Sequence, residues 1–122
     1  MKPAPLLNIP YDPANTDILG SVKVDRRALA SGLSNITAGF AEWIDGKEME
    51  PWVLPYEEAV YVISGELTIT AGDITVVGRP GDMITCEKGV EQLAVAAPGT
   101  RVFFASYPAN WRETSDRPTV RE

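Results

Sequence analysis

The 122-residue chain contains no histidine and only one cysteine, Cys86. Without an imidazole, the usual Ser–His–Asp type of nucleophilic centre cannot be built, and the commonest nitrogen ligand of protein metals is missing. A lone cysteine cannot form an internal disulfide, which suits a reduced compartment. We therefore expect a cytoplasmic protein with no metal and no cofactor.

Long apolar runs and basic patches are missing too. No uninterrupted apolar segment approaches the roughly 20 residues that span a bilayer, and residues 1–7 carry no apolar stretch of the signal-peptide kind. Acidic residues outnumber basic ones, 17 to 11, so the formal net charge is −6. Nucleic acids and anionic membranes attract basic surfaces, and we expect neither as a partner.

What the chain does contain is a series of short β-rich segments separated by glycine and proline. Pro80-Gly81 suits the second and third places of a type II turn. Such spacing, without a long helical pattern, predicts one all-β domain folded as a sandwich or barrel. The expected strands are residues 18–24, 35–43, 58–63, 66–70, 74–77, 83–86, 92–97 and 100–107.

The expected domain organisation has three parts. Residues 1–17 form an irregular proline-rich arm, because four prolines there disfavour helix and remove backbone donors. Residues 18–111 form the barrel. Residues 112–122 are charged and form a flexible tail.

One stretch carries a specific motif with two substitutions. Gly46, Glu58 and Gly65 stand where the first cupin motif places glycine, glutamate and glycine, in Gly-x5-His-x-His-x3-Glu-x6-Gly. Trp52 and Leu54 occupy the two histidine places. A barrel scaffold is thus indicated while its usual metal ligands are replaced.

A second motif follows in the right order. Gly81 and Gly89 match its glycines, and Gln92 and Ala96 replace its histidine and asparagine. Together the two motifs resemble the cupin superfamily. The resemblance implies an RmlC-like double-stranded β-helix, a jelly-roll barrel whose strands alternate inward and outward side chains.

The motif places predict which side chains share the cavity. If Glu58 points inward, Val60 and Val62 do so as well, and Glu57 and Tyr61 point outward. Gln92 approaches from the opposite wall. The catalytic candidates are Glu58 and Tyr56, and the candidate substrate-binding residues are Trp52, Leu54, Val60, Gln92 and Trp43.

A carboxyl group in an apolar cavity has a raised pKa, because desolvation disfavours its charged form. Glu58 can then act as a general acid or base near neutral pH, while Tyr56 or Gln92 hydrogen-bonds a carbonyl oxygen. The alternatives are structural. Glu58 ties down a loop, Trp52 and Leu54 fill the core, and Trp43 belongs to the core or to a dimer interface.

Four stretches carry a narrower resemblance: Pro51 to Glu58, Tyr61 to Glu66, Ala38 to Trp43 and Tyr107 to Trp111. Over residues 35–111 the sequence resembles the cupin domain of EutQ-type ethanolamine utilisation proteins. The resemblance implies a cytoplasmic, often dimeric barrel without the standard metal site. It also implies links to bacterial microcompartments and to acetate kinase activity.

Three hypotheses of function follow. The first is a metal-independent enzyme of isomerase, lyase or cyclase type that moves a proton next to a carbonyl in a small oxygenated metabolite. The second is a non-catalytic accessory or binding module near a microcompartment. The third is a EutQ-like acetate kinase. A homodimer is expected in each case, because outward aromatics such as Tyr61 and Phe103 can be buried across a two-fold interface.

Overall fold

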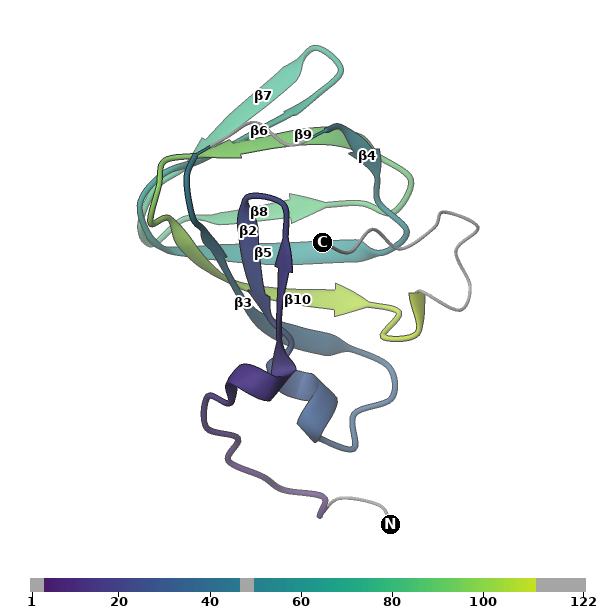
Figure 1. The fold of residues 1–122 in the computed structure, drawn as a ribbon. Coiled ribbons are helices and arrows are strands. Elements are labelled where there is room, and N and C mark those ends of the chain that lie inside the picture. The colour runs from purple at the N-terminus through teal and green to yellow at the C-terminus, as the bar shows by residue number, and fades with distance from the viewer. Residues whose placement is uncertain (1–3, 47–49, 112–122) are drawn as a thin grey trace.

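The computed structural model describes residues 4–46 and 50–111, and strands make up about half of that part of the chain (Figure 1). In chain order the strands are β1 (Thr16–Leu19), β2 (Val22–Asp25), β3 (Thr37–Trp43), β4 (Trp52–Val53), β5 (Glu57–Ser64), β6 (Leu67–Ala71), β7 (Ile74–Gly78), β8 (Met83–Cys86), β9 (Glu91–Ala96) and β10 (Arg101–Tyr107). Two short 3-10 turns, η1 (Pro13–Asn15) and η2 (Arg27–Ala30), flank the first hairpin.

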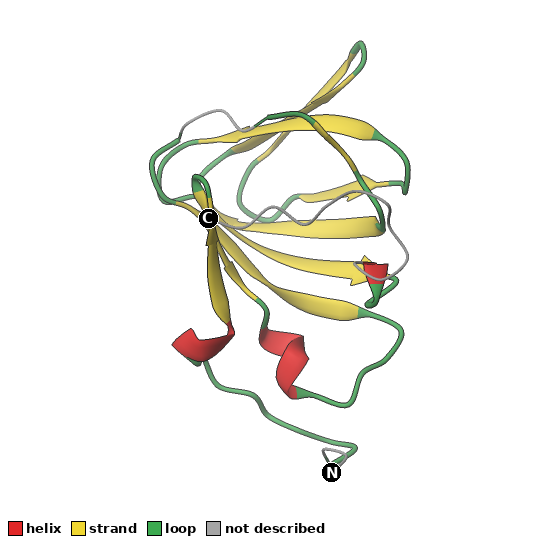
Figure 2. Cartoon of the chain, turned by 45° about the vertical axis from the view of Figure 1, so that its right-hand side comes forward, coloured by secondary structure: helices red, strands yellow, loops and turns green. Residues whose placement is uncertain are grey.

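The strands form two facing sheets. The larger sheet has the order β1-β2-β3-β10-β5-β8, and the smaller has the order β4-β9-β6-β7. All paired strands are antiparallel, and from β3 onward the chain changes sheet at every connection except β6–β7. Figure 2 shows the two layers of strands and the 3-10 turns at one end of the larger sheet. The predicted jelly-roll barrel is confirmed.

Most of the predicted strands and the Pro80-Gly81 turn are present. The amide of Asp82 donates to the carbonyl of Arg79 at 2.8 Å, which closes the turn. Gly81 has a φ of 96°, a conformation that only glycine adopts without strain. The prediction of a turn at Pro80-Gly81 is therefore confirmed.

The prediction of one strand over residues 18–24 is wrong. Gly20, with a φ of 61°, reverses the chain there, and Leu19 pairs with Val22 across a tight hairpin. Strand β4 was not predicted, because two residues give no alternating pattern to recognise. The hairpin matters for the site, since its inward face lines the interior.

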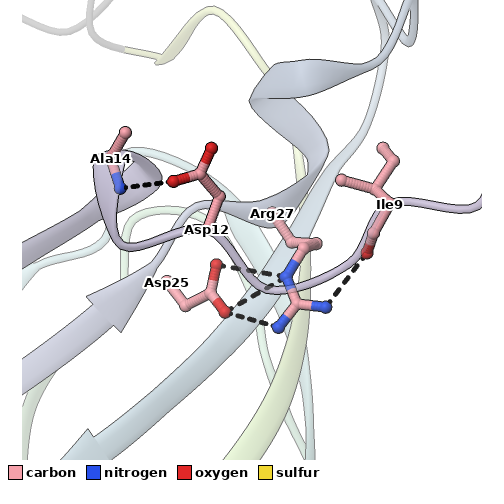
Figure 3. A network of polar contacts seen from close by, with 5 residues as sticks. All are labelled: Ile9, Asp12, Ala14, Asp25 and Arg27. Atoms are coloured by element: carbon pink, nitrogen blue, oxygen red, sulfur yellow. Dashed lines mark hydrogen bonds and ion pairs between the residues drawn. The ribbon is translucent and has the colours of Figure 1, made fainter.

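The expected N-terminal arm is partly ordered. Strand β1 begins at Thr16, ahead of the expected boundary at residue 17, and Asp12 caps η1 by accepting from the amide of Ala14 at 2.9 Å. The carbonyl of Ile9 accepts from Arg27 Nη1 at 3.1 Å, which holds the arm against the outer surface (Figure 3). The expected tail at 112–122 lies outside the described residues.

One glycine allows a close approach between segments. A Cβ atom at Gly39 in β3 would collide with the backbone oxygen of Asp25 and would come within 3.2 Å of the amide of Arg27. The chain leaving β2 can therefore lie directly over β3. The consecutive residues Arg26 and Arg27 lie on opposite sides of the larger sheet. Arg26 lines the cavity, and Arg27 lies over the ring of Phe40 on the outer face.

The core is built by inward-facing residues of both sheets. In β5 the buried positions alternate, with Val60 and Val62 inside and Tyr61 exposed, as predicted. No helix in the described part of the chain is long and apolar enough to cross a membrane. The buried apolar cluster consists of Val22, Ala41, Trp43, Val60, Val62, Leu67, Ile69, Ile84, Ala96 and Val102.

Candidate functional site

A cavity of about 690 Å³ lies between the two sheets. Cavities that hold small-molecule ligands span roughly 300 to 1,000 Å³ and are mostly apolar with a few polar groups. This cavity has that character. Its lining residues are Leu19, Gly20, Ser21, Val22, Val24, Arg26, Leu29, Thr37, Ala41, Trp43, Glu50, Trp52, Tyr56, Glu58, Val60, Leu67, Ile69, Gln92, Ala94, Val102, Phe104, Ser106, Ala109, Asn110 and Trp111.

Glu58 stands in a row of polar residues that crosses the larger sheet. Ser106 of β10 is its register partner on one side, and Cys86 of β8 is its partner on the other. Thr37 of β3 pairs with Ser106 and extends the row. Because partners in adjacent strands point to the same face, the row presents a polar band to the cavity within apolar walls.

Burial dominates the chemistry of Glu58. Desolvation raises the pKa of its carboxyl group to about 7, and a hydrogen bond from Ser106 opposes this rise. That bond is long, with 3.4 Å between Ser106 Oγ and Glu58 Oε2. Glu58 therefore populates both its protonated and its ionised form near neutral pH.

The smaller sheet supplies the facing polar group. Gln92 of β9 is 9% exposed, and its Oε1 accepts a hydrogen bond from the Cys86 thiol at 3.3 Å. Burial, and secondarily the charge of Glu58, raises the pKa of Cys86, so this side chain stays a thiol at neutral pH. With Oε1 occupied, the amide nitrogen of Gln92 is the end that can donate to a ligand.

Three aromatic rings gather along the wall of the cavity. Trp52, Tyr56 and Trp111 contact one another edge to face, with ring centroids 5.3 to 6.0 Å apart. They come from β4, the segment before β5 and the segment after β10. Edge-to-face contacts between aromatic rings stabilise a protein beyond the effect of burying their apolar area. The cluster thus joins three separate segments into one apolar surface facing the cavity.

The structure places six of the seven predicted site residues on the cavity: Glu58, Tyr56, Trp52, Val60, Gln92 and Trp43. Leu54 is the exception, since it is 1% exposed and does not belong to the lining. Strand β4 ends at Val53, and the backbone of Leu54 bonds to Val90 and Gly89 instead. Alternation from Trp52 therefore does not continue to Leu54, whose side chain fills the core.

Trp43 lies at the other end of β3 from Thr37 and is 7% exposed. Its indole nitrogen is buried and has no hydrogen-bond partner within residues 4–46 and 50–111. The ring lines the cavity and belongs to the buried apolar cluster as well. The core interpretation of Trp43 and its contact with the cavity are therefore compatible.

Sequence reasoning did not predict the other lining residues, and three of these bear on the chemistry of the site: Ser106, Trp111 and Arg26. Ser106 could have been found by alternation, because it shares the parity of the apolar residues Val102 and Phe104 in the predicted strand. Trp111 stands in one of the stretches that carry the family resemblance, but no role was given to it. Arg26 was hidden, because the hairpin that places it was predicted as a single strand.

Possible metal ligands are dispersed. Within the described ranges, no group of three or more cysteine, aspartate and glutamate side chains lies close enough to hold a metal ion. Glu58 and Cys86 are register partners, whereas Glu57 is exposed on the opposite face of β5. Glu87 and Glu91 are likewise solvent-exposed or nearly so in the segments around β8 and β9.

Comparison with known proteins agrees with the fold. A family model described as ethanolamine utilisation protein EutQ matches residues 15–113. The acetate kinase EutQ of Salmonella typhimurium is 30% identical over 79 residues, which cover 65% of this chain and 34% of the relative. The acetate kinase EutQ of Escherichia coli is 29% identical over 79 residues, which cover 65% and 33%. The chain thus spans about a third of the length of these curated relatives.

Solved structures show the same fold. The Clostridium difficile EutQ protein superimposes with a TM-score of 0.69 and 23% identity, covering 84% of this chain and 83% of that one. An RmlC-like cupin from Shewanella frigidimarina superimposes with a TM-score of 0.69 and 17% identity, covering 85% and 93%. Both comparisons identify the barrel architecture, and at these identities they carry no statement of activity.

Proposed function

The chain belongs to the EutQ family, and on that premise we propose that its cavity binds a small oxygenated metabolite whose proton next to a carbonyl is moved by Glu58. The activity would be of the isomerase, lyase or cyclase type. The observation that carries the proposal is the position of Glu58, a carboxyl group on the wall of a largely apolar cavity with a pKa of about 7. A general acid or base works best when its pKa lies near the working pH.

The proposed proton transfer uses the polar row and the wall that faces it. Ionised Glu58 removes a proton from the carbon next to the ligand carbonyl, and the electron pair moves onto the carbonyl oxygen. A donor must stabilise that oxygen, and the amide nitrogen of Gln92 or the hydroxyl of Tyr56 suits this role. Protonated Glu58 then returns the proton to another carbon, or to a leaving group in an elimination.

The remaining lining residues shape the ligand. Val60 and Phe104 are register partners on the inner face and provide an apolar floor beside the polar row. The cluster of Trp52, Tyr56 and Trp111 offers an aromatic surface for an apolar portion. A compact, partly apolar carbonyl compound fits these surroundings better than a highly charged one.

The test compares two neighbouring glutamates. Glu58→Gln removes the titrating group from the cavity, while Glu57→Gln changes the exposed neighbour on the opposite face of β5. Small carbonyl metabolites that raise the melting temperature are incubated in D₂O, and NMR follows deuterium incorporation next to the carbonyl. We expect Glu58→Gln to slow enzyme-dependent exchange at least about 100-fold and Glu57→Gln to leave it unchanged. Exchange that survives Glu58→Gln in a folded protein would refute the proposal.

The name of the curated relatives supports an acyl kinase as the second candidate. Phosphoryl transfer depends on cationic groups and Mg²⁺ around the phosphates. Among the described lining residues Arg26 is the single cationic side chain, which is fewer than the several cationic groups that phosphoryl transfer uses. The kinase predicts stabilisation by ATP with Mg²⁺ and phosphate transfer to acetate, whereas proton transfer predicts neither.

A binding module without chemistry is the third candidate. It predicts a ligand that stabilises the wild type and Glu58→Gln equally, with no deuterium exchange in either. Thermal shift and NMR exchange measured on the same samples therefore separate all three candidates.

We also propose that two copies pair through the outer face of the larger sheet. Four apolar side chains form a register row there: Phe40, Phe103, Tyr61 and Met83. Tyr61 is 46% exposed and Met83 is 66% exposed, so the row presents apolar area to solvent. Light scattering of the wild type and of Tyr61→Ser tests this, and a monomeric wild type would contradict it.

A further inference from the structure

We propose that Arg26 is the specificity determinant of the cavity and that the ligand carries a carboxylate, so that the substrate is a small oxo or hydroxy acid. This inference rests on the proposed function, because it extends the ligand of the same cavity. It concerns a residue that the sequence analysis did not single out. It is carried by the placement of Arg26, its burial and its ion pair with Asp17.

Arg26 reaches the interior because of the first hairpin. Val24 of β2 lines the cavity and pairs with Asp17 of β1, so these two side chains share the inward face. Arg26 follows Val24 by two residues and lines the cavity as well. Gly39 permits this course, since a side chain there would collide with the backbone of Asp25.

The ion pair orients the guanidinium group. Arg26 Nε donates to Asp17 Oδ2 at 2.7 Å, and the two side chains are 15% and 26% exposed. A guanidinium has five N–H donors in a planar fork, so the contact through Nε leaves the Nη side for another acceptor. Arginine is the residue that best recognises a planar carboxylate through paired N–H groups.

The distance from Arg26 to Glu58 fits a compact ligand. The two residues stand on β5 and just beyond β2, with β3 and β10 between these strands. Three strand spacings amount to about 14 Å between backbones, and less in a curved sheet. Both side chains project into that space. A carboxylate held by Arg26 would therefore point the rest of a short carbon chain toward Glu58.

The other charges of the cavity are consistent with this orientation. Glu50 and Glu58 are the acidic lining residues within the described ranges. An anionic end would be repelled from both, and Arg26 offers it a cationic partner on the hairpin side. The electrostatics of the cavity thus distinguish the two ends of the ligand.

The experiment uses matched pairs of probes. Oxo acids of short chain, such as 4-oxopentanoate, are each compared with the corresponding amide, such as 4-oxopentanamide, by calorimetric titration of the full chain. We expect the wild type to bind the best carboxylate at least tenfold more tightly than its amide. Arg26→Gln should remove this preference by weakening the carboxylate and not the amide, and Arg26→Lys should retain part of it.

Lys23→Gln is the matched control. It removes one positive charge from β2, the strand that precedes Arg26, but Lys23 lies over the ring of Tyr11 on the outer face. It should leave the carboxylate preference unchanged. The double variant Asp17→Asn/Arg26→Gln removes both members of the ion pair, so that loss of preference is measured without an uncompensated charge. The melting temperature of each variant reports that it is folded.

The outcomes separate this inference from the proposed function. If no carboxylate of the series binds more tightly than its amide, or if Arg26→Gln weakens both equally, the inference is overturned. Deuterium exchange that still depends on Glu58 would then leave the proposed function intact. A carboxylate preference that depends on Arg26, together with exchange that ignores Glu58→Gln, would support the ligand class and refute the proton transfer.

Discussion

Asp25 and Glu58 are carboxyl groups on opposite faces of the same sheet, with different partners. Asp25 lies on the outer face, is 6% exposed, and accepts from Arg27 Nε at 3.1 and 3.3 Å and from Nη2 at 2.7 Å (Figure 3). Glu58 on the inner face has the Ser106 hydroxyl at 3.4 Å. The two carboxyl groups therefore differ in their partners, a charged guanidinium for Asp25 and a neutral hydroxyl for Glu58.

The contacts of Arg27 show that the Asp25 carboxyl group has a structural role. Its guanidinium lies 4.9 Å from the ring centroid of Phe40 and 5.9 Å from that of Tyr11, and it also holds the carbonyl of Ile9. The hydrogen bond to Asp25 is the main cause that raises the pKa of Arg27. This network fixes the N-terminal arm on the barrel. A carboxyl group with a guanidinium partner serves structure, whereas one facing a cavity with a weak hydroxyl partner is available for chemistry.

The largest effect is expected where the two regions meet. Gly39→Ala should lower the free energy of unfolding by about 4 kcal/mol, because the new Cβ collides with the backbone of Asp25 and displaces both Asp25 and Arg26. Urea unfolding measures the loss. A change below about 1 kcal/mol would show that the β2 segment moves away easily and that the two networks are not coupled through β3.

The second prediction concerns the pH dependence of stability that the buried Glu58 carboxyl group causes. Its carboxyl pKa rises from 4.5 to about 7 on folding, so folding favours the protonated form. The stabilisation is fully present below pH 4.5 and is lost as the pH rises through about 7. Relative to Glu58→Gln, the wild type should lose about 3 kcal/mol across this window.

Urea unfolding of both proteins at pH 4.5, 6 and 8 checks this prediction. Groups shared by the two proteins cancel in the difference between them. A difference that does not change with pH would mean that Glu58 is solvated in the fold. Glu57→Gln, on the exposed face of the same strand, should behave as the wild type at each pH.

The third prediction is that neutralising the two carboxyl groups shifts the melting temperature in opposite directions. Asp25→Asn keeps the shape of the side chain but removes the charge that Arg27 binds, and it should lower the melting temperature by about 5 °C at pH 8. Glu58→Gln should raise the melting temperature at the same pH, because it removes a charge from an apolar cavity. Differential scanning calorimetry of the two variants compares the faces directly. Equal shifts in one direction would contradict the distinction.

The sequence predicted correctly which side chains of β5 share the inner face with Glu58. Strand side chains repeat with a period of two, so one assigned position orients its neighbours. That argument placed Val60 beside Glu58 and Tyr61 outside. It failed for Leu54, because alternation holds only within a strand and β4 ends one residue earlier.

Arg26 and Arg27 show why the rest could not be predicted. Adjacent arginines after a strand carry no local signal of which one enters the interior. The answer depends on the turn at Gly20, on the pairing of β2 with β3 and on the space above Gly39, all of which are tertiary. The partners Asp17 and Asp25, eight residues apart, become meaningful only once the hairpin has formed.

The smallest effect concerns the hydroxyl beside Glu58. Ser106 Oγ donates to the carboxylate and lowers its pKa, against the larger effect of burial. Ser106→Ala should therefore raise the pKa of Glu58 further and shift the window of pH-dependent stability upward. NMR titration of the Glu58 carboxyl carbon measures this directly, with Glu57 in the same spectrum as the exposed reference. Because the bond is long, the shift should be small beside the change caused by burial. A shift downward would mean that the hydroxyl accepts from protonated Glu58, and Ser106 would then hold the acid form rather than the base.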